Sequence, residues 1–369
     1  SVVPKDFMTS AMAERPPVSI ITGYLGSGKT TLLNRLLADP GMARAAVIIN
    51  EFGEIGLDHL LVATPNENTV LLANGCLCCT VRGDLVDTLR DLHERRRDGV
   101  LPPFDRVLVE TTGLADPVPI LQTLITDEAV APLYRADGVV TLVDAVHGAR
   151  NLDEHAEAVK QAALADCMLI TKCDLAGARA ITALEDRLAR VNPGARRFRV
   201  TRGEITPGEL FGAAFDNANG GVTRWLNLAA YAAQTAGRRK RAGRHEGNIH
   251  SFSLYLDRPA TRAGLMTWLN LLATMRGVNL LRVKGLINVE GRPFAIQAVQ
   301  TVIDEPVELP RWPDADRRSR LIFITRGLVR EELERTLAAL EIGTDAHAPR
   351  GALDPRAYAR FVAAAQGFR

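Results

Sequence analysis

The chain has 369 residues and a formal net charge of +2, with 47% hydrophobic and 24% charged residues. Its length exceeds the usual size of one domain, so two domains are expected, and its composition is that of an ordinary globular protein. The near-neutral charge argues against a general attraction to nucleic acid or to membranes, and no apolar stretch approaches the length that spans a bilayer.

The first 17 residues contain no apolar segment of the signal-peptide type, so they are expected to form a flexible leader. Only five cysteines occur in the whole chain. Together these features favour a cytoplasmic protein, because a reducing compartment keeps thiols free.

The first motif follows a short apolar run, Val18–Ile21, that predicts a buried strand. Residues 23–30 read Gly-Tyr-Leu-Gly-Ser-Gly-Lys-Thr, which fits the P-loop pattern G-x-x-x-x-G-K-[ST], and an amphipathic helix pattern follows. The glycines let successive N–H groups point at phosphate oxygens. Lys29 would reach the β and γ phosphates, and the Thr30 hydroxyl would bind Mg²⁺. The candidate nucleotide-binding residues here are Gly23, Gly26, Ser27, Gly28, Lys29, Thr30 and Thr31.

A second motif is Cys76-Leu77-Cys78-Cys79, which holds three of the five cysteines. Adjacent cysteines are poorly placed to bridge one another, whereas clustered thiolates suit Zn²⁺, Co²⁺ or Cu(I). Three thiolates leave one tetrahedral position open, which favours a transferable or catalytic metal. Glu54 or His59 could instead supply a fourth ligand. The cluster could also bind no metal and consist of small buried side chains with one reactive thiol.

Apolar strand patterns alternate with helical patterns through the first 200 residues. This alternation predicts a mostly parallel sheet covered by helices on both faces, with ligands bound beyond the carboxyl ends of the strands. Strands are expected at 46–49, 69–72, 106–109, 138–143, 168–171 and 197–200. Helices are expected at 83–97, 117–125, 151–165 and 178–191.

The expected strand 106–109 is followed by Glu110-Thr111-Thr112-Gly113. An acidic residue followed three positions later by glycine resembles a Walker B and switch II element. The Glu110 carboxylate could hold Mg²⁺ through its water shell, and the Gly113 N–H could bond the γ-phosphate. Glu110 is therefore counted with Lys29 and Thr30 among the candidate catalytic residues.

The expected strand 168–171 leads into Thr171-Lys172-Cys173-Asp174, which fits the guanine-reading pattern [N/T]-K-x-D. The Asp174 carboxylate can accept both N1–H and the exocyclic amine of guanine, whereas adenine offers no matching pair of donors. The Lys172 stem could lie across the purine and tie back to the P-loop.

These motifs together resemble the CobW-like P-loop GTPases, metallochaperones of the SIMIBI class. The resemblance covers 22–33, the segment Ile49-Asn50-Glu51-Phe52-Gly53-Glu54-Ile55-Gly56-Leu57-Asp58, the motif at 73–79, and the segments 110–117 and 171–174. It implies that residues 50–58 are switch I and that Cys76, Cys78 and Cys79 bind the metal cargo. Glu51, Glu54 and Asp58 are further candidate metal ligands.

The resemblance implies a protein that uses GTP binding and slow hydrolysis to GDP to time the delivery of zinc, cobalt or another transition metal to a client metalloprotein. Two other functions stay open at this stage. One is a regulatory GTP-binding switch whose cysteine cluster senses metal or redox state, and the other is an ATP-dependent kinase, which requires Asp174 to play no part. A homodimer is left open.

The expected domains are a leader at 1–17, a P-loop GTPase domain at 18–228, a basic linker at 229–248, a CobW-like α+β domain at 249–345 and a helical tail at 346–369. In the second domain, strands are expected at 250–256, 280–289, 294–302 and 321–325, and a helix at 259–275. Many members of the resembled family carry a histidine-rich run between the domains, whereas this linker holds only His245 before His250. This departure weakens any case for bulk metal storage or nickel preference. His250 is read as a half-buried strand residue or a ligand, and His147 and His155 as surface residues.

Overall fold

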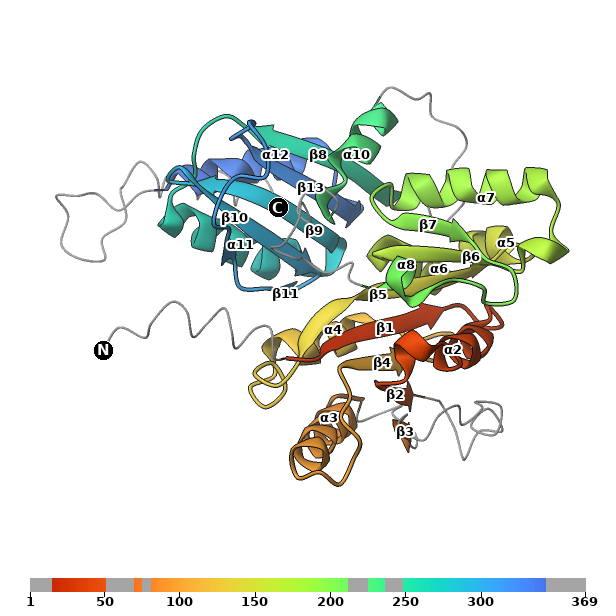
Figure 1. Cartoon of the computed structure of the whole chain (residues 1–369). Helices are drawn as coiled ribbons and strands as arrows, with labels where there is room; N and C mark the ends of the chain where they lie inside the picture. Colours follow the sequence, from red (N-terminus) through yellow and green to blue (C-terminus); the bar gives the residue numbers. More distant parts are fainter. Residues whose placement is uncertain (1–14, 51–69, 75–80, 212–224, 236–247, 343–369) are drawn as a thin grey trace. The chain divides into compact units, whose positions relative to one another are not determined.

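The computed structural model describes residues 15–50, 70–74, 81–211, 225–235 and 248–342 (Figure 1). The chain divides into two compact units, the first comprising Ser1–Arg187 and Ala195–Phe215 and the second comprising Leu188–Gly194 and Asp216–Arg369. Among the described helices, none is both long enough and apolar enough to cross a bilayer. The leader at 1–14 and the C-terminal segment 343–369 lie outside the described residues.

The first unit is built on a sheet whose seven described strands pair in parallel in the order β3-β2-β4-β1-β5-β6-β7 (Figure 1). Strand β1 and strand β6 are buried along their whole length, as expected where helices cover both faces of a sheet. The strands are β1 (Pro17–Gly23), β2 (Ala45–Asn50), β3 (Val70–Asn74), β4 (Arg106–Glu110), β5 (Arg135–Asp144), β6 (Cys167–Thr171) and β7 (Arg196–Arg199).

Helices connect these strands, and their apolar stripes form the core. Helix α2 shows the pattern: Leu32, Leu33, Leu36 and Leu37 are buried and join one cluster with the sheet residues Ile21, Val47 and Leu108. The helices are α2 (Lys29–Leu37), α3 (Val81–Arg97), α4 (Val118–Thr126), α5 (Gly148–Glu154), α6 (Ala156–Leu164), α7 (Ala178–Val191) and α8 (Pro207–Leu210), with 3₁₀ turns η1 (Pro40–Met42) and η3 (Cys173–Leu175).

The single helix expected at 151–165 was a wrong prediction, because the structure has two helices there. Helix α5 ends at Glu154 and helix α6 begins at Ala156, and His155 between them has an extended backbone with φ −128° and ψ 116°. The His155 ring stacks on Tyr24 with a centroid distance of 4.5 Å. This contact lies between residues 131 positions apart, so the local helical pattern of the sequence could not indicate the break.

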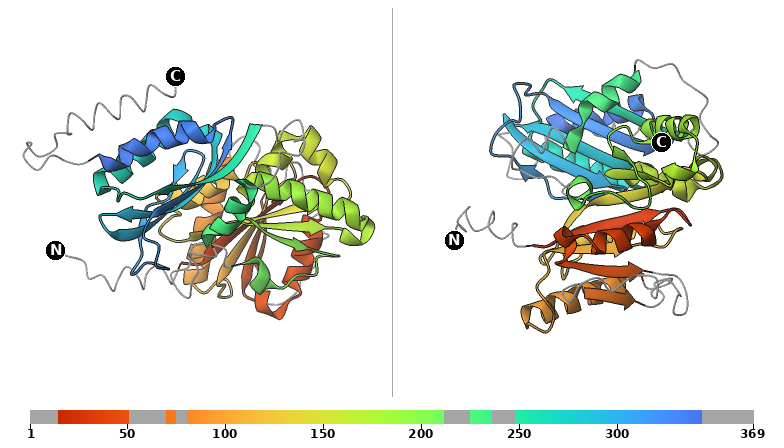
Figure 2. Two further views of the ribbon diagram at one scale, coloured as in Figure 1. Left: turned by 90° about the horizontal axis from the view of Figure 1, so that it is seen from above. Right: turned by 45° about the vertical axis from the view of Figure 1, so that its right-hand side comes forward.

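The second unit is a smaller α+β layer structure (Figure 2). Its described strands pair antiparallel in the order β11-β10-β9-β13-β8, with β12 added to β10. Helices α11 and α12 contribute Trp268, Leu272 and Leu333 to a core shared with sheet residues such as Phe323. The elements are α10 (Leu228–Thr235), β8 (Ile249–Leu256), α11 (Arg262–Arg276), η5 (Gly277–Asn279), β9 (Leu280–Val289), β10 (Arg292–Val299), β11 (Val302–Ile303), β12 (Val307–Glu308), β13 (Ser319–Arg326), α12 (Arg330–Thr336) and η6 (Leu337–Glu341).

Two local expectations for this unit need correction. The linker was expected to begin at residue 229, but Leu228–Thr235 form helix α10. Tyr231 of this helix is buried and packs against Gly194. The strand expected at 294–302 is a hairpin, because Gln300 adopts φ 55° and turns β10 into β11. The remainder of the linker, 236–247, lies outside the described residues.

Candidate nucleotide-binding site

The P-loop joins the end of β1 to the start of α2. Gly26 and Gly28 have φ values of 69° and 96°, in the left-handed region that a side chain disfavours, and Gly28 directly precedes the first residue of α2. A Cβ atom at Gly23 would lie 2.5 Å from the carbonyl oxygen of Leu142 and 2.7 Å from Ser27 Oγ, so a larger residue does not fit there. The sequence therefore folds into a glycine-dependent cradle that opens a helix, the arrangement that binds phosphate.

Side chains of this loop are arranged for a polar ligand. Lys29 Nζ donates a 2.9 Å hydrogen bond to the carbonyl oxygen of Gly23, which folds the ammonium group back over the loop. Ser27 is 1% exposed, and its Oγ atom has no hydrogen-bond partner among the described residues. A buried hydroxyl without a partner costs free energy, so this atom suits a ligand that supplies one. Thr30 is half-buried and Thr31 is exposed.

The loop after β4 lies against the P-loop. Glu110 is 6% exposed. Thr111 is bound to β1 by two hydrogen bonds: its N–H donates to Ile21 O at 2.9 Å, and its hydroxyl donates to Thr22 Oγ1 at 2.8 Å. Gly113 is so close to the P-loop that a Cβ atom would lie 2.7 Å from Leu25 N and 2.8 Å from Leu25 Cα. Only glycine fits at 113, because a side chain there would clash with the backbone and side chain of Leu25 in the P-loop.

The guanine motif follows β6. Thr171 is buried, and its hydroxyl donates a 2.7 Å hydrogen bond to Ser27 O. The tie to the P-loop expected of Lys172 is therefore made by Thr171. Lys172 has a left-handed backbone, φ 56°, and its Nζ lies 2.6 Å from Asp144 Oδ2. Asp174 is exposed in the 3₁₀ turn η3, where a base could reach it.

Asp144 is a residue that the sequence reasoning missed. It ends β5, is 3% exposed, and also accepts N–H bonds from Val146 at 2.7 Å and His147 at 3.3 Å. Burial by itself raises the pKa of Asp144, but its hydrogen bonds with Lys172 and Val146 outweigh burial and lower that pKa below its ordinary value. The sequence could have indicated Asp144 through its position: it ends the strand next to β6, at the same sheet edge as the P-loop.

Replacing Asp144 with asparagine should lower the free energy of unfolding at pH 7 by about 1.5–3 kcal/mol, the value of a hydrogen bond to a charged group. A carboxyl group whose pKa is lowered by folding stabilises the protein above its unfolded-state pKa of about 3.9, and this contribution is lost as pH falls through the folded pKa. The difference between the variant and the native protein should thus shrink in acid.

Urea unfolding at pH 7 and in acid measures this difference. Asp153→Asn is the matched control, because Asp153 also pairs with a cation, Arg187 at 2.8 Å, but with a half-exposed carboxylate. Such surface pairs contribute little. Equal effects of the two substitutions at pH 7 would contradict the role given to Asp144.

One cavity of about 490 Å³ brings three of the predicted motifs together. It is lined by residues 25–31 of the P-loop and the start of α2, by residues 110–113 after β4, and by Lys172. Its volume is within the usual range for small-molecule sites. Thr171 holds the P-loop from beside this cavity, and Asp174 is exposed two residues beyond Lys172.

The predicted transition-metal site lies outside the described residues. This applies to Cys76, Cys78 and Cys79, to the candidate ligands Glu51, Glu54 and Asp58, and to His59. Within the described ranges, no group of three or more His, Cys, Asp or Glu residues could hold a metal ion. The two described cysteines are free thiols, and burial raises the pKa of Cys167 to about 12.

The histidines outside the motifs fall in different surroundings. His147 is exposed, as expected, and His250 is half-buried on β8 opposite Thr325. His155 was expected at the surface, but it is only partly exposed and stacks on Tyr24 of the P-loop.

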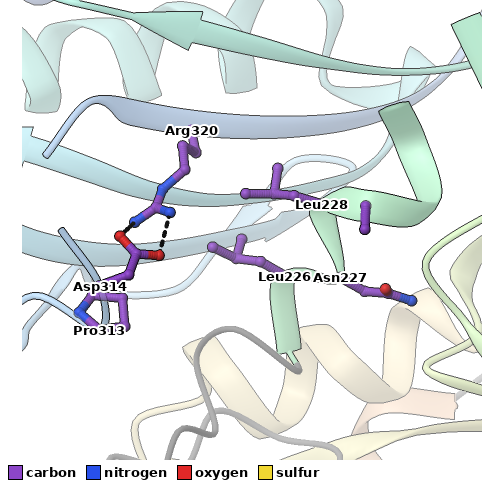
Figure 3. A pocket seen from close by; sticks show the side chains of 7 residues that line it. Leu226, Asn227, Leu228, Pro313, Asp314 and Arg320 are labelled. Atoms are coloured by element: carbon purple, nitrogen blue, oxygen red, sulfur yellow. Dashed lines mark hydrogen bonds and ion pairs between the residues drawn. The ribbon is translucent and has the colours of Figure 1, made fainter. Parts of the chain in front are cut away.

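A second cavity, of about 280 Å³, lies in the second unit (Figure 3). Its walls are Leu226–Ala229 and Pro313, and its charged groups are Asp314 and Arg320. These two side chains form a bidentate pair, with N–O distances of 2.6 and 3.0 Å. Because the pair neutralises itself, this cavity offers less to a charged ligand than the P-loop cavity does.

A parallel sheet with a P-loop, an acidic strand end and a guanine motif around one cavity defines a P-loop nucleotide-binding protein. The family model described as "CobW/HypB/UreG, nucleotide-binding domain" matches residues 17–199, and the model described as "Cobalamin synthesis protein cobW C-terminal domain" matches residues 249–341. The chain belongs to this family, which confirms the resemblance seen in the sequence.

Similar proteins cover nearly the whole chain. The zinc chaperone YjiA of Escherichia coli (strain K12) is 35% identical over 325 residues, which are 88% of this chain and 98% of that protein. The zinc chaperone CobW of a Sinorhizobium species is 29% identical over 86% of this chain and 95% of its own length. The crystal structure of Zn(II)-bound YjiA GTPase from E. coli aligns with a TM-score of 0.67 and 31% identity, over 88% of this chain and 99% of that chain. This alignment confirms the predicted fold class.

Proposed function

We propose that this chain is a GTP-hydrolysing metallochaperone that binds zinc at Cys76, Cys78 and Cys79 and delivers it to a client metalloprotein. The proposal rests on one observation: the P-loop, the loop after β4 that carries Gly113, and Lys172 of the guanine motif line the same cavity. The names of the relatives support a metal cargo and favour zinc over cobalt. The thiolate ligands require a reducing compartment, so we place the protein in the cytoplasm.

Each motif has a separate task in the proposed hydrolysis. Lys29 binds the β and γ phosphates, the N–H groups of the glycine cradle bind phosphate oxygens, and Asp174 reads guanine. The Gly113 N–H bonds the γ-phosphate, so the loop after β4 reports whether that phosphate is present. These groups position the phosphates and stabilise the charge that develops on them during transfer.

The residues present fit a magnesium ion. Thr30 and Glu110 line the same cavity, and the buried hydroxyls Ser27 Oγ and Thr112 Oγ1 have no hydrogen-bond partner among the described residues. Thr30 and Glu110 would hold Mg²⁺, which would neutralise negative charge on the β and γ oxygens.

The proposed domain division keeps nucleotide binding in one part of the chain. We propose a GTPase domain that begins at residue 18 and a CobW-like domain at 249–345. The end of the GTPase domain, expected at 228, moves to an earlier position because the chain from Asp216, including helix α10, groups with the second unit. The two family models, which match 17–199 and 249–341, support this division. We also propose that the cysteines follow β3, at the sheet edge where β1 ends in the P-loop.

The proposal predicts that zinc affinity rises when GTP is bound. If GTP orders the segment 50–58 and brings the three thiolates together, the coupling should be about 1–3 kcal/mol, or 5–150-fold in affinity. A competition titration with Zn²⁺ measures this in the presence of a GTP analogue, GDP or neither. Because thiolate ligation releases protons, affinity should also weaken as pH falls.

A variant with Cys76, Cys78 and Cys79 replaced by serine is the test of the site, and Cys173→Ser is its matched control. The triple variant should lose tight zinc binding and the control should keep it. Unchanged zinc affinity in the triple variant would remove the site. The rival regulatory switch also predicts zinc binding, but no transfer of zinc from the GTP-bound protein to an apo-metalloprotein on hydrolysis.

A further inference from the structure

Helix α6 holds the loop that carries Gly113. The Gln161 side chain is almost fully buried, and its amide nitrogen donates to the carbonyl oxygens of Gly113 at 3.3 Å and Ala115 at 3.1 Å. These two carbonyl groups lie on either side of Leu114, which is 52% exposed. The loop cannot rotate about Gly113 without breaking these contacts.

The neighbouring residue on α6 makes a second contact with the same loop. Lys160 Nζ lies 2.5 Å from Asp116 Oδ2, and the Lys160 side chain is only 17% exposed. The other oxygen of Asp116 accepts the Val118 N–H at 3.1 Å, so the same carboxylate also fixes the start of α4. Residues 160 and 161 therefore hold the middle of the loop, at Gly113 and Ala115, and its C-terminal end, at Asp116.

The same helix is fixed to the P-loop and to the sheet. His155, which precedes the first residue of α6, stacks on Tyr24 with an interplanar angle of 18°. The Gln161 carbonyl oxygen accepts a 2.9 Å hydrogen bond from the buried Thr141 hydroxyl of β5. Helix α6 thus connects the P-loop, the central sheet and the loop that is expected to sense the γ-phosphate.

We propose that Lys160 and Gln161 are positioning residues that hold Gly113 in place for the γ-phosphate and so set the preference of the site for a nucleoside triphosphate over a diphosphate. This inference rests on the proposed function. We call these two residues the α6 latch. Neither residue lines the nucleotide cavity, so they act through Gly113 and not by touching the nucleotide.

The direction of the effect follows from where Gly113 lies. It already forms part of the cavity wall and is packed against Leu25 of the P-loop, so the latch keeps the loop in a position ready for a ligand. Without the latch, the loop must become ordered when a triphosphate binds, and the entropy lost in ordering it lowers the affinity for the triphosphate. A diphosphate has no γ-phosphate to contact Gly113, so its affinity should not depend on the latch.

The test is calorimetric titration of GDP and of a non-hydrolysable GTP analogue into the full chain with Mg²⁺. Gln161→Met keeps the length of the side chain and the backbone bond to Thr141 but removes the amide donors. It should weaken the analogue about tenfold, the equivalent of one to two hydrogen bonds, and change GDP affinity by less than about twofold. Gln122→Met on α4 is the matched control and should leave both affinities unchanged.

A second pair of variants covers the case in which Gln161→Met fails to fold. Lys160→Met should lower the affinity ratio of analogue to GDP about threefold, and Lys160→Arg, which keeps the charge opposite Asp116, should restore it. Equal weakening of both nucleotides, or an unchanged ratio in folded latch variants, would overturn the latch while leaving the proposed function standing. A native protein that binds neither nucleotide would overturn the proposed function itself.

Discussion

Replacing Lys29 with alanine should lower the rate of GTP hydrolysis by about 10²–10³-fold or more, the loss seen when a preorganised group that stabilises transition-state charge is removed. Negative charge accumulates on the β and γ oxygens during transfer, and the Lys29 ammonium is the charged side chain that the P-loop pattern provides there. Its hydrogen bond in the structure is to the P-loop carbonyl of Gly23, at 2.9 Å. A nucleotide would replace that contact with phosphate oxygens.

The fold should tolerate this change, because Lys29 is only half-buried at the first position of α2. Single-turnover hydrolysis and thermal unfolding of the same samples separate loss of activity from loss of structure. Arg35→Ala is the matched control: it removes a cation from the same helix, but one that is 59% exposed and lies 4.0 Å from Glu204. A Lys29→Ala protein that hydrolyses GTP within a few-fold of the native rate would show that the P-loop is not the reacting site.

Discrimination between guanine and adenine should be the second large effect. GTP should bind at least about tenfold more tightly than ATP, because adenine leaves the Asp174 carboxylate without its donor pair, at a cost of about 1–3 kcal/mol or more. Asp174 is exposed in the structure, so this cost arises only when a base covers the carboxylate. Asp174→Ala should therefore narrow the gap between the two nucleotides mainly by weakening GTP.

Calorimetry with GTP and ATP on the native protein, on Asp174→Ala and on Asp186→Ala measures this gap. Asp186 is also an exposed carboxylate, on helix α7, and its removal should leave the preference unchanged. Equal affinities for GTP and ATP in the native protein would contradict the assignment of Asp174 to guanine recognition. The alternative of an ATP-dependent kinase would then have to be tested.

The parts of the site that the sequence predicted are those that short segments determine by themselves. The P-loop needs glycine at fixed positions, and the structure places Gly26 and Gly28 at positive φ between β1 and α2. Parallel pairing then brings the ends of β1, β4 and β6 to one sheet edge, so motifs far apart in the sequence meet at one cavity.

The residues that the sequence did not predict act through contacts between distant elements. Asp144 pairs with Lys172 across neighbouring strands, Gln161 reaches a loop 46–48 positions earlier, and His155 stacks on Tyr24. A single Gln on an amphipathic helix has no local signature that distinguishes a buried contact with a loop from an ordinary surface amide.

Titration of a GTP analogue with and without saturating Zn²⁺ measures whether this protein couples guanine nucleotide binding to zinc binding. Linkage requires bound zinc to tighten the analogue by the same factor, about 5–150-fold, by which the analogue tightens zinc. We expect this gain in affinity for the analogue in the native protein, little gain for GDP, and none when Cys76, Cys78 and Cys79 are serine. An analogue affinity that is the same with and without zinc would contradict the coupling.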